Sequence, residues 1–280
     1  MTRIVVSTDC ICDLPLKLIE RYSIPVMYYY INIDEFRFRD IKEIDSTSVL
    51  EYLEDNKKAT STSAPEEEYK TFFEENTKEG NILIHITSSK QLSDGYKNAF
   101  EASKNMENVF VVDSCKISGA MGILVVTAAD LARKGATVEI ILKELEKVRE
   151  KIECSFVLKS ADSLTQNSRM DQRITDLLNT LSVHPVMSVK NRKLIFEKFI
   201  LGNEKQYIRS YIKAVLYHPS DIDDNLLIIN TVGFSYEMQQ FIISETKKYV
   251  DFKHIYVEKA SATISCNCGS GTFGLLFMRR

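Results

Sequence analysis

The chain has 280 residues, of which 44% are hydrophobic and 27% charged, and its formal net charge is -3. This length and composition are typical of a globular protein with one large or two modest domains. The acidic balance argues against nucleic-acid binding, which usually requires a basic excess or a basic stripe.

The start of the chain does not have the pattern of a secretory signal. Met1–Thr8 leads directly into a strand-like run, and no apolar run is long enough to cross a bilayer. The six cysteines form no regular disulfide framework. We therefore expect a cytoplasmic protein with reduced thiols.

Strand-like runs alternate with amphipathic helical patterns along the first half of the chain. Gly122–Arg133 has the pattern of a long helix. The expected strands are Arg3–Ser7, Val26–Ile33, Asn81–Ile86, Val109–Asp113 and Cys154–Leu158. This alternation predicts an α/β fold with a largely parallel sheet.

The pattern changes near Ser160, where the polar segment Ser160–Asp171 reads as a linker. A hairpin and further helices and strands follow it. The expected elements are strands Val186–Val189 and Leu194–Phe199, helix Glu204–Leu216, strand Leu226–Asn230, helix Tyr236–Val250 and strand His254–Glu258. We predict two α/β domains with largely parallel sheets, covering residues 1–160 and 161–280.

Hydroxyl side chains follow several of the predicted strands. Thr8 and Asp9 end the first strand, Thr87–Ser89 follow a second, and Asp113 and Ser114 end a third. Open parallel sheets bind ligands at the carboxyl ends of their strands. No cluster of histidines or paired carboxylates joins these residues, so the pattern favours hydrogen-bonded recognition over acid–base chemistry.

Ser93 comes just before the helical pattern Tyr96–Ser103, together with Asp94 and Gly95. A helix start offers free N–H groups and suits a carboxylate or a phosphate. The alternative, which the local pattern favours, is that Ser93 or Asp94 is a helix N-cap.

Two other segments also allow either a structural role or a role in ligand binding. Ser63 followed by Glu66 matches a capping box ahead of the helix Glu67–Phe73, which leaves Thr60–Thr62 free to bind a ligand. Arg169, in the polar linker, is able to pair with a carboxylate or phosphate in two-point fashion, and its alternative is an exposed surface arginine.

Two motifs are rejected. The segment Gly269–Gly274 satisfies G-x-G-x-x-G, but too few residues follow it for a dinucleotide-binding unit. Cys10 with Cys12, and Cys266 with Cys268, form C-x-C pairs that are tighter than the usual zinc spacing and have no histidine beside them. We expect no metal site, and the sequence leaves open whether the four thiols meet.

Six segments in chain order together resemble the motifs of the DegV family. They are TDCICDLP (Thr8–Pro15), STSAP (Ser61–Pro65), ITSSKQLSDGYKNA (Ile86–Ala99), VVDSCKISGAMG (Val111–Gly122), SRMD (Ser168–Asp171) and CNCGSGTFG (Cys266–Gly274). The chain departs from the family pattern at Asn267, where histidine is usual, and at Ser270, where proline is usual. It also has Cys10 in place of serine and Asp94 in place of glycine.

The resemblance implies two α/β domains with a long-chain fatty acid at or near their interface, and no other cofactor. It implies that Thr62 and Ser93 bind the carboxyl group and that Gly95 helps through its backbone. Arg169 would assist phosphoryl transfer from ATP held on a separate dihydroxyacetone-kinase-like subunit. The chain would then be a non-catalytic carrier, for which transient membrane contact is possible. The remaining candidate pocket residues are Asp9, Cys10, Ser61, Asn267 and Cys268.

Three alternatives remain open. The changes at Asn267 and Ser270 favour a lipid-binding sensor or store that is not coupled to a kinase. A hydrolase that uses Ser93 would lack both the G-x-S-x-G elbow and a recognisable base. A transcription regulator has no support from the acidic charge balance.

Overall fold

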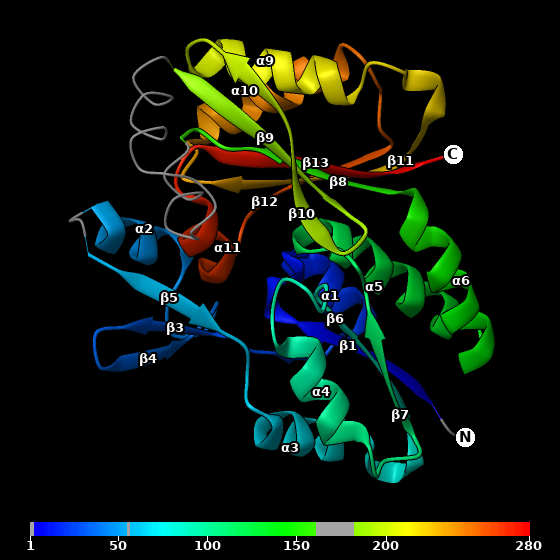
Figure 1. The fold of residues 1–280 in the computed structure, drawn as a ribbon. Coiled ribbons are helices and arrows are strands. Elements are labelled where there is room, and N and C mark those ends of the chain that lie inside the picture. The colour runs from blue at the N-terminus through cyan, green and yellow to red at the C-terminus, as the bar shows by residue number, and fades with distance from the viewer. Residues whose placement is uncertain (1–2, 55–56, 161–181) are drawn as a thin grey trace.

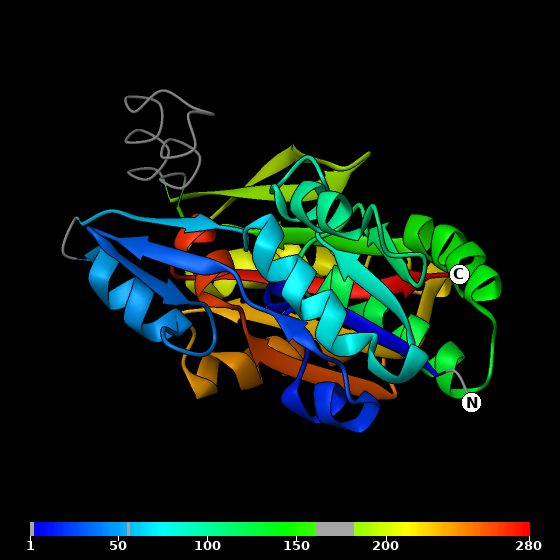
Figure 2. The ribbon, with the colours of Figure 1, turned by 90° about the horizontal axis from the view of Figure 1, so that it is seen from below.

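The computed structural model describes residues 3–54, 57–160 and 182–280. In this part of the chain, three sheets are arranged with helices between and around them (Figure 1). A four-stranded sheet and a six-stranded sheet form the two large layers, and a small three-stranded sheet lies beside them (Figures 1 and 2).

The four-stranded sheet is parallel throughout. Its strands, in spatial order, are β2 (Val26–Met27), β1 (Ile4–Asp9), β6 (Ile82–Thr87) and β7 (Val109–Asp113). Helices α3 (Glu66–Asn76) and α4 (Gly95–Ser103) pack on one face, where Tyr69, Phe73 and Leu83 are fully buried. The short helices η1 (Cys10–Cys12), α1 (Leu16–Tyr22) and η2 (Lys78–Gly80) lie in the connections.

Helix α5 (Ser118–Arg133) lies between the two large sheets (Figure 1). Its first eight residues are all buried, because the helix contacts strands of both sheets. A helix that is apolar on every side belongs in the interior. Helix α6 (Val138–Lys151) is amphipathic and packs against α5 with Ile141 and Leu145.

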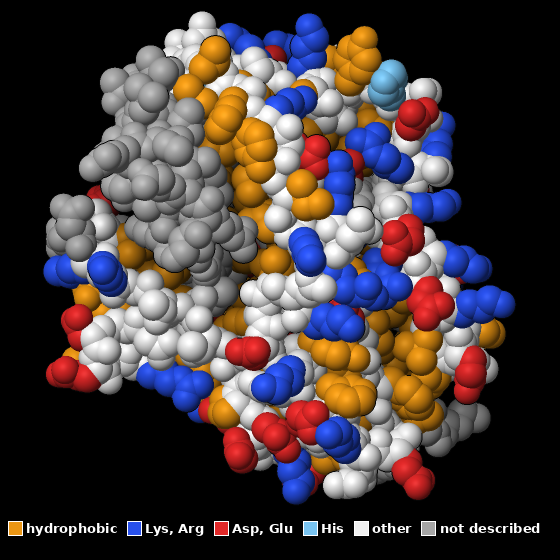
Figure 3. All heavy atoms as spheres, viewed as in Figure 1, with side chains coloured by type: hydrophobic (Ala, Val, Ile, Leu, Met, Phe, Trp, Pro, Cys, Tyr) orange, Lys and Arg blue, Asp and Glu red, His pale blue; other side chains and the backbone are white. Residues whose placement is uncertain are grey.

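The six-stranded sheet is mixed, because β11–β12 is its parallel pair and its other pairings are antiparallel. Its strands, in spatial order, are β10 (Lys193–Leu201), β9 (Val183–Lys190), β8 (Ile152–Val157), β13 (Thr272–Arg279), β11 (Ile222–Val232) and β12 (His254–Lys259). Helices α9 (Glu204–Val215) and α10 (Tyr236–Lys247) cover its outer face, and η3 (Pro219–Asp221) precedes β11. Hydrophobic side chains that include Phe196, Phe199 and Leu201 remain exposed on β10 (Figure 3).

The small sheet has the antiparallel order β4 (Phe36–Arg39), β3 (Tyr30–Ile33), β5 (Ala59–Thr62). Helices α2 (Ser46–Glu54) and α11 (Ala262–Cys268) pack against it, so an element near the end of the chain contacts elements near its start.

The predicted α/β fold class is confirmed, with two differences in detail. The second large sheet is mixed instead of largely parallel, because the β9–β10 hairpin and the returning strand β13 join it. The expected strand Val26–Ile33 is wrong as a single element. It divides into β2 and β3, which belong to different sheets, because the chain leaves the first sheet at Tyr28 and Tyr29.

The expected boundary near residue 160 remains a prediction. Strand β8 precedes residue 160 but pairs with β13 and β9, so the six-stranded sheet begins before this boundary. Most of the predicted linker Ser160–Asp171, including Arg169, lies outside the described residues. No helix among the described residues is long and apolar enough to span a membrane.

Candidate functional site

A cavity of about 780 Å³ lies where the three sheets and helix α11 meet. This volume is within the range of small-molecule binding sites. Its apolar wall includes residues of β8, β9 and β13, which belong to the six-stranded sheet. The apolar side chains that line it include Ile11, Leu92, Ile117, Phe156, Leu158, Met187, Leu194, Val232, Ile264, Phe273 and Leu276.

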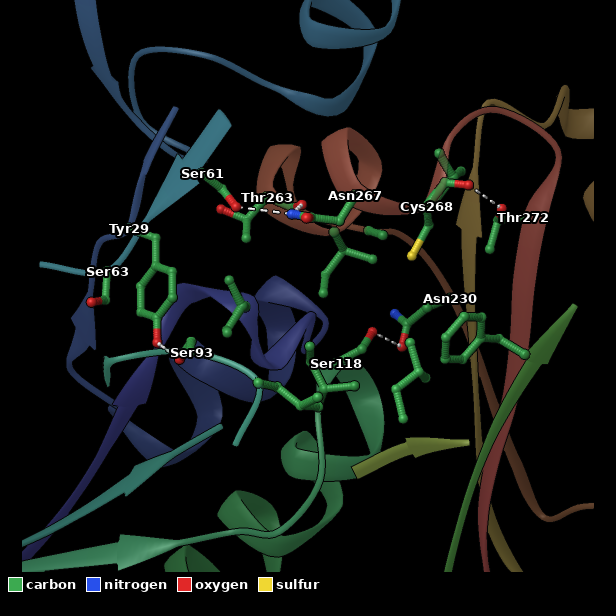
Figure 4. Close-up of a pocket in the computed structure, with 18 of the residues that line it drawn as sticks. Tyr29, Ser61, Ser63, Ser93, Ser118, Asn230, Thr263, Asn267, Cys268 and Thr272 are labelled. Atoms are coloured by element: carbon green, nitrogen blue, oxygen red, sulfur yellow. Dashed lines mark hydrogen bonds between the residues drawn. The ribbon is translucent and has the colours of Figure 1, made fainter. Parts of the chain in front are cut away.

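Hydroxyl groups gather on one side of this cavity. Ser61 and Thr62 come from β5, Ser63 follows that strand, and Ser93 precedes α4. Figure 4 shows Ser63, Ser93 and the Tyr29 ring on one side of the pocket, with Asn230 across from them. An extended ligand that reaches from this side to β8, β9 and β13 therefore meets hydroxyl groups at one end and apolar side chains along much of its remaining length.

Ser93 is held by three polar neighbours. Its Oγ lies 2.8 Å from the Tyr29 hydroxyl and 2.9 Å from Ser88 Oγ, and it accepts a hydrogen bond from the Gly95 N–H at 3.2 Å. Asp94 occupies the N-cap position of α4 but makes no capping hydrogen bond through its side chain. Ser93, by contrast, accepts the N–H of Gly95 at the start of α4, so its side chain supplies the cap that the local pattern predicted.

Behind Ser93 lies a buried polar network. The Tyr29 hydroxyl donates to Asp9 Oδ2 at 3.3 Å, and the Tyr69 hydroxyl donates to Asp9 Oδ1 at 2.7 Å. His85 Nε2 lies 3.2 Å from the same Oδ1 atom. Burial and the Asp9 charge raise the pKa of the Tyr29 hydroxyl well above its usual value, so this group stays neutral.

Asp9 and Cys10 were expected in the pocket lining, but the structure places them elsewhere. Both are buried and contact Tyr29: Asp9 through the tyrosine hydroxyl, and Cys10 Sγ as the acceptor of the Tyr29 N–H at 3.2 Å. The wall at this point is the Tyr29 ring itself, which comes from the Tyr28–Tyr30 cluster of the sequence. Long-range contacts such as these leave no local signal.

Gly95 supports the site from behind. It is buried and does not line the cavity, and its N–H donates to Ser93, so it does not offer this group directly to a ligand as was expected. A Cβ atom at this position would lie 2.0 Å from the Tyr29 hydroxyl oxygen. Glycine is therefore required for Tyr29 to approach Ser93.

The hydroxyls of β5 are oriented by amide side chains. Asn32 Nδ2 donates to Thr62 Oγ1 at 3.3 Å, and Asn267 Nδ2 donates to Ser61 Oγ at 2.8 Å. Each hydroxyl therefore keeps its own proton for another acceptor. Alternate residues of a strand point to opposite faces, so Ser61 faces α11 and Thr62 faces the opposite side of the small sheet.

The prediction of a capping box at Ser63 is wrong. Helix α3 begins after Pro65 without a side-chain cap. Ser63 instead lines the pocket and accepts a hydrogen bond from Asn98 Nδ2 at 3.2 Å.

Asn267 and Cys268 line the cavity as expected, together with Ser61 and Thr62. Cys10 and Cys12 are buried in η1. Cys266 is buried in α11, where its Sγ lies 3.3 Å from the carbonyl oxygen of Ala59. Among the described residues, no group of three or more His, Cys, Asp or Glu side chains is arranged to hold a metal ion.

A second polar cluster, which the sequence did not indicate, forms another part of the wall. Ser118 and Asn230 line the cavity, and both contact Asp13. Asp13 Oδ1 accepts the Ser261 N–H at 2.8 Å. Burial raises the pKa of the Asp13 carboxyl to about 7, although hydrogen bonds from Ser118 and Ser261 act in the opposite direction.

The site is suited to holding a ligand, because its hydroxyls are donors and its apolar wall is extensive. Ser93 has no histidine or carboxylate among its described hydrogen-bond partners, so no described group is placed to activate it as a nucleophile. Arg169 lies outside the described residues, and its role stays a prediction.

The two large sheets, with α5 between them and a cavity with an extensive apolar wall at their edge, define an α/β protein built around a ligand pocket. The family model described as "Uncharacterised protein, DegV family" matches residues 3–280. The chain therefore belongs to the DegV family, and the resemblance seen in its six motifs is confirmed.

Relatives and solved structures agree with this assignment. A DegV domain-containing protein of Clostridium perfringens is 30% identical over 212 residues, which cover 73% of this chain and 75% of that protein. The structure described as "Fatty Acid Binding of a DegV family Protein from Thermus thermophilus" has a TM-score of 0.89 at 22% identity and 100% coverage of both chains. The Streptococcus pneumoniae "Fatty Acid Kinase (Fak) B3 protein loaded with linoleic acid" has a TM-score of 0.83 at 16% identity, also with 100% coverage of both chains.

Proposed function

We propose that this chain binds a long-chain fatty acid in the cavity, with the acyl tail along the apolar wall and the carboxyl group at Thr62 and Ser93. The observation that carries the proposal is the asymmetry of the pocket, in which the hydroxyls of Ser61–Ser63 and Ser93 gather on one side and apolar side chains of β8, β9 and β13 form much of the remaining wall. The Thermus thermophilus and Streptococcus pneumoniae proteins with the same fold, whose descriptions name fatty acid binding and bound linoleic acid, support it.

The physical chemistry of the site fits this ligand. Each buried CH₂ group contributes about 0.8 kcal/mol, so a tail of about sixteen carbons contributes roughly 11 kcal/mol before the costs of association. A carboxylate that leaves water needs hydrogen bonds in return. The tail therefore supplies most of the affinity, and the hydroxyls fix which end lies at Ser93.

We further propose that the chain acts as a carrier, which presents the carboxyl group to a separate dihydroxyacetone-kinase-like, ATP-binding subunit for acyl-phosphate formation. Arg169 would assist that transfer. Support comes from the resemblance of SRMD (Ser168–Asp171) to a family motif and from the description of the Streptococcus pneumoniae protein with the same fold, which names it a "Fatty Acid Kinase (Fak) B3 protein". The chain alone would then turn nothing over.

Native mass spectrometry of the purified protein, followed by denaturation and lipid identification, tests the binding proposal. We expect one fatty acid per chain, released on denaturation. A protein that is purified empty and also fails to take up added fatty acids would contradict the proposal. A stoichiometric metal ion in the same spectrum would instead direct attention to the cysteines.

A further inference from the structure

The described lining of the cavity contains two charged side chains, Arg37 on β4 and Asp94 before α4. Neither belongs to the hydroxyl set that was expected to hold the ligand head. Asp94 carries the same sign as a carboxylate and would repel it. Arg37 is the cation of this part of the wall, and its position relative to Thr62 follows from the small sheet.

Arg37 and Thr62 lie on the same face of the small sheet, on the two strands that flank β3. Arg37 is paired with Asn32 across the β3–β4 ladder, and Asn32 donates to Thr62 Oγ1. The Arg37 Cζ atom stacks 3.4 Å from the centre of the Tyr30 ring. Tyr30 is in turn the direct partner of Thr62 across the β3–β5 ladder, so its side chain and that of Thr62 share one face.

Arg37 is held in place but not neutralised. Stacking on Tyr30 restricts the guanidinium without removing its charge. Among the described residues, no carboxylate lies within ion-pair distance of Arg37. The nearby Glu68 carboxylate accepts the Tyr30 hydroxyl at 2.5 Å. The N–H groups of Arg37 therefore remain available to an anionic oxygen.

The other polar groups of this side do not supply a positive charge. The hydroxyls are neutral, and the amide of Asn267 donates to Ser61 Oγ and to the Thr263 carbonyl oxygen, both at 2.8 Å. An anion that receives only neutral donors is less well compensated than one that also contacts a guanidinium. Among the described groups of this side, Arg37 is therefore the one that can balance the negative charge of the ligand head.

We propose that Arg37 binds the anionic head group of the ligand, and so makes the site select for an ionised acid over a neutral lipid of the same length. The contact adds to the hydrogen bonds at Thr62 and Ser93. It rests on the proposed fatty-acid binding and concerns the same cavity. The chemistry that it recognises is a carboxylate, and equally the phosphate of an acyl phosphate.

The test compares hexadecanoate with hexadecan-1-ol on delipidated protein, by displacement of a neutral fluorescent hydrocarbon probe. Arg37→Ala is expected to weaken binding of the acid about tenfold, in line with the loss of a charge-assisted hydrogen bond, and to leave binding of the alcohol unchanged. Arg37→Lys should recover part of the loss, because lysine keeps the charge without the planar fork. The deficit of Arg37→Ala should shrink at high salt.

Arg39→Ala is the matched control. Arg39 lies two residues along β4, points to the same face, is exposed and is not part of the cavity lining. Its loss should leave both affinities unchanged. The inference is overturned if Arg37→Ala binds the acid as tightly as the wild type, if it weakens acid and alcohol equally, or if Arg39→Ala reproduces its effect. A wild type that binds neither lipid would instead contradict the proposed function.

Discussion

Ser118 and Asp13 share a hydrogen bond at the junction of the two large sheets, and Ser118 Oγ also lies 3.1 Å from Asn230 Oδ1. The orientation of Asn230 is fixed, because its Nδ2 donates to the Asp13 carbonyl oxygen and its Oδ1 accepts the Gly119 N–H. The Ser118 hydroxyl has one proton, so it cannot donate to both Asp13 Oδ2 and Asn230 Oδ1. If Asp13 is protonated, it donates to Ser118, which donates to Asn230, and both contacts are hydrogen bonds.

This geometry agrees with the raised pKa of Asp13, about 7 in the folded chain against 3.8 for an ordinary aspartate. Between these values the native state binds a proton that the unfolded state does not, so the free energy of unfolding falls as the pH rises. The loss from this group begins near pH 4, is complete somewhat above pH 7, and amounts to about 4 kcal/mol at most.

Asp13→Asn tests this reading of the junction. The amide imitates the protonated acid, since its Nδ2 donates to Ser118 and its Oδ1 accepts the Ser261 N–H. We expect this variant to lose the pH dependence and to be more stable than the wild type at pH 8, as measured by urea unfolding from pH 5 to 8. Asp251→Asn, at an exposed position, is the control. A parallel pH profile for the wild type and Asp13→Asn would contradict the shared proton.

A second prediction concerns the close approach of Gly95 and Tyr29. Gly95→Ala should destabilise the protein by about 2 kcal/mol, because the new Cβ would overlap the tyrosine hydroxyl. In Tyr29→Phe/Gly95→Ala the overlapping oxygen is absent, so most of that cost should disappear. A double-mutant cycle from denaturant unfolding measures the coupling. Additive effects of the two substitutions would show that the strain lies elsewhere.

The hydroxyls at the ligand head give a third prediction. Thr62→Ala and Ser93→Ala should each weaken fatty-acid binding by about 1 kcal/mol, roughly fivefold, because each removes one donor to the carboxyl group. Calorimetric titration of delipidated protein measures the change. Ser48→Ala, on exposed α2 and away from the cavity lining, is the control. Unchanged affinity in both site variants would show that the ligand head lies in another part of the cavity.

Arg169 gives a fourth prediction, which separates binding from transfer. Under the proposed carrier role, Arg169→Ala should keep its fatty acid but fail to support acyl-phosphate formation when a kinase subunit and ATP are added. Lipid content by mass spectrometry and ATP consumption measure the two properties independently. If the variant loses its lipid instead, Arg169 is part of the binding site. If the wild type supports no ATP consumption while it holds lipid, the sensor or store alternative is favoured.

The sequence predicted those features that depend on local pattern. The hairpin around Lys190–Lys193 and most strands follow from periodicity, and the motif segments located Ser61, Thr62 and Ser93, which line the pocket. Helix α11 was missed, because its residues belong to a segment that reads as Gly-rich and short.

Long-range contacts account for the other differences. Asp9 and Tyr29 are 20 residues apart and become neighbours only because β1 and the segment after β2 fold together. Asp13 and Asn230 are 217 residues apart. The sequence at Ser63 matches a capping box, but α3 begins directly after Pro65 without a side-chain cap, and Asn98 Nδ2 donates to Ser63 Oγ. Arg37 lies on a four-residue strand without a motif, so its place in the wall required the sheet register.

The apolar wall gives the last prediction, because it should set the preferred chain length. Met187 on β9 lines the cavity in a small cluster with Leu158, whereas the adjacent Val186 points to the opposite face and packs in the outer core. Met187→Ala should enlarge the cavity and shift the bound lipids toward longer chains. Val186→Ala should lower stability by about 2 kcal/mol or less and leave the lipid profile unchanged. Identical lipid profiles for Met187→Ala and the wild type, in a competition among fatty acids of different length, would show that the tail does not reach this wall.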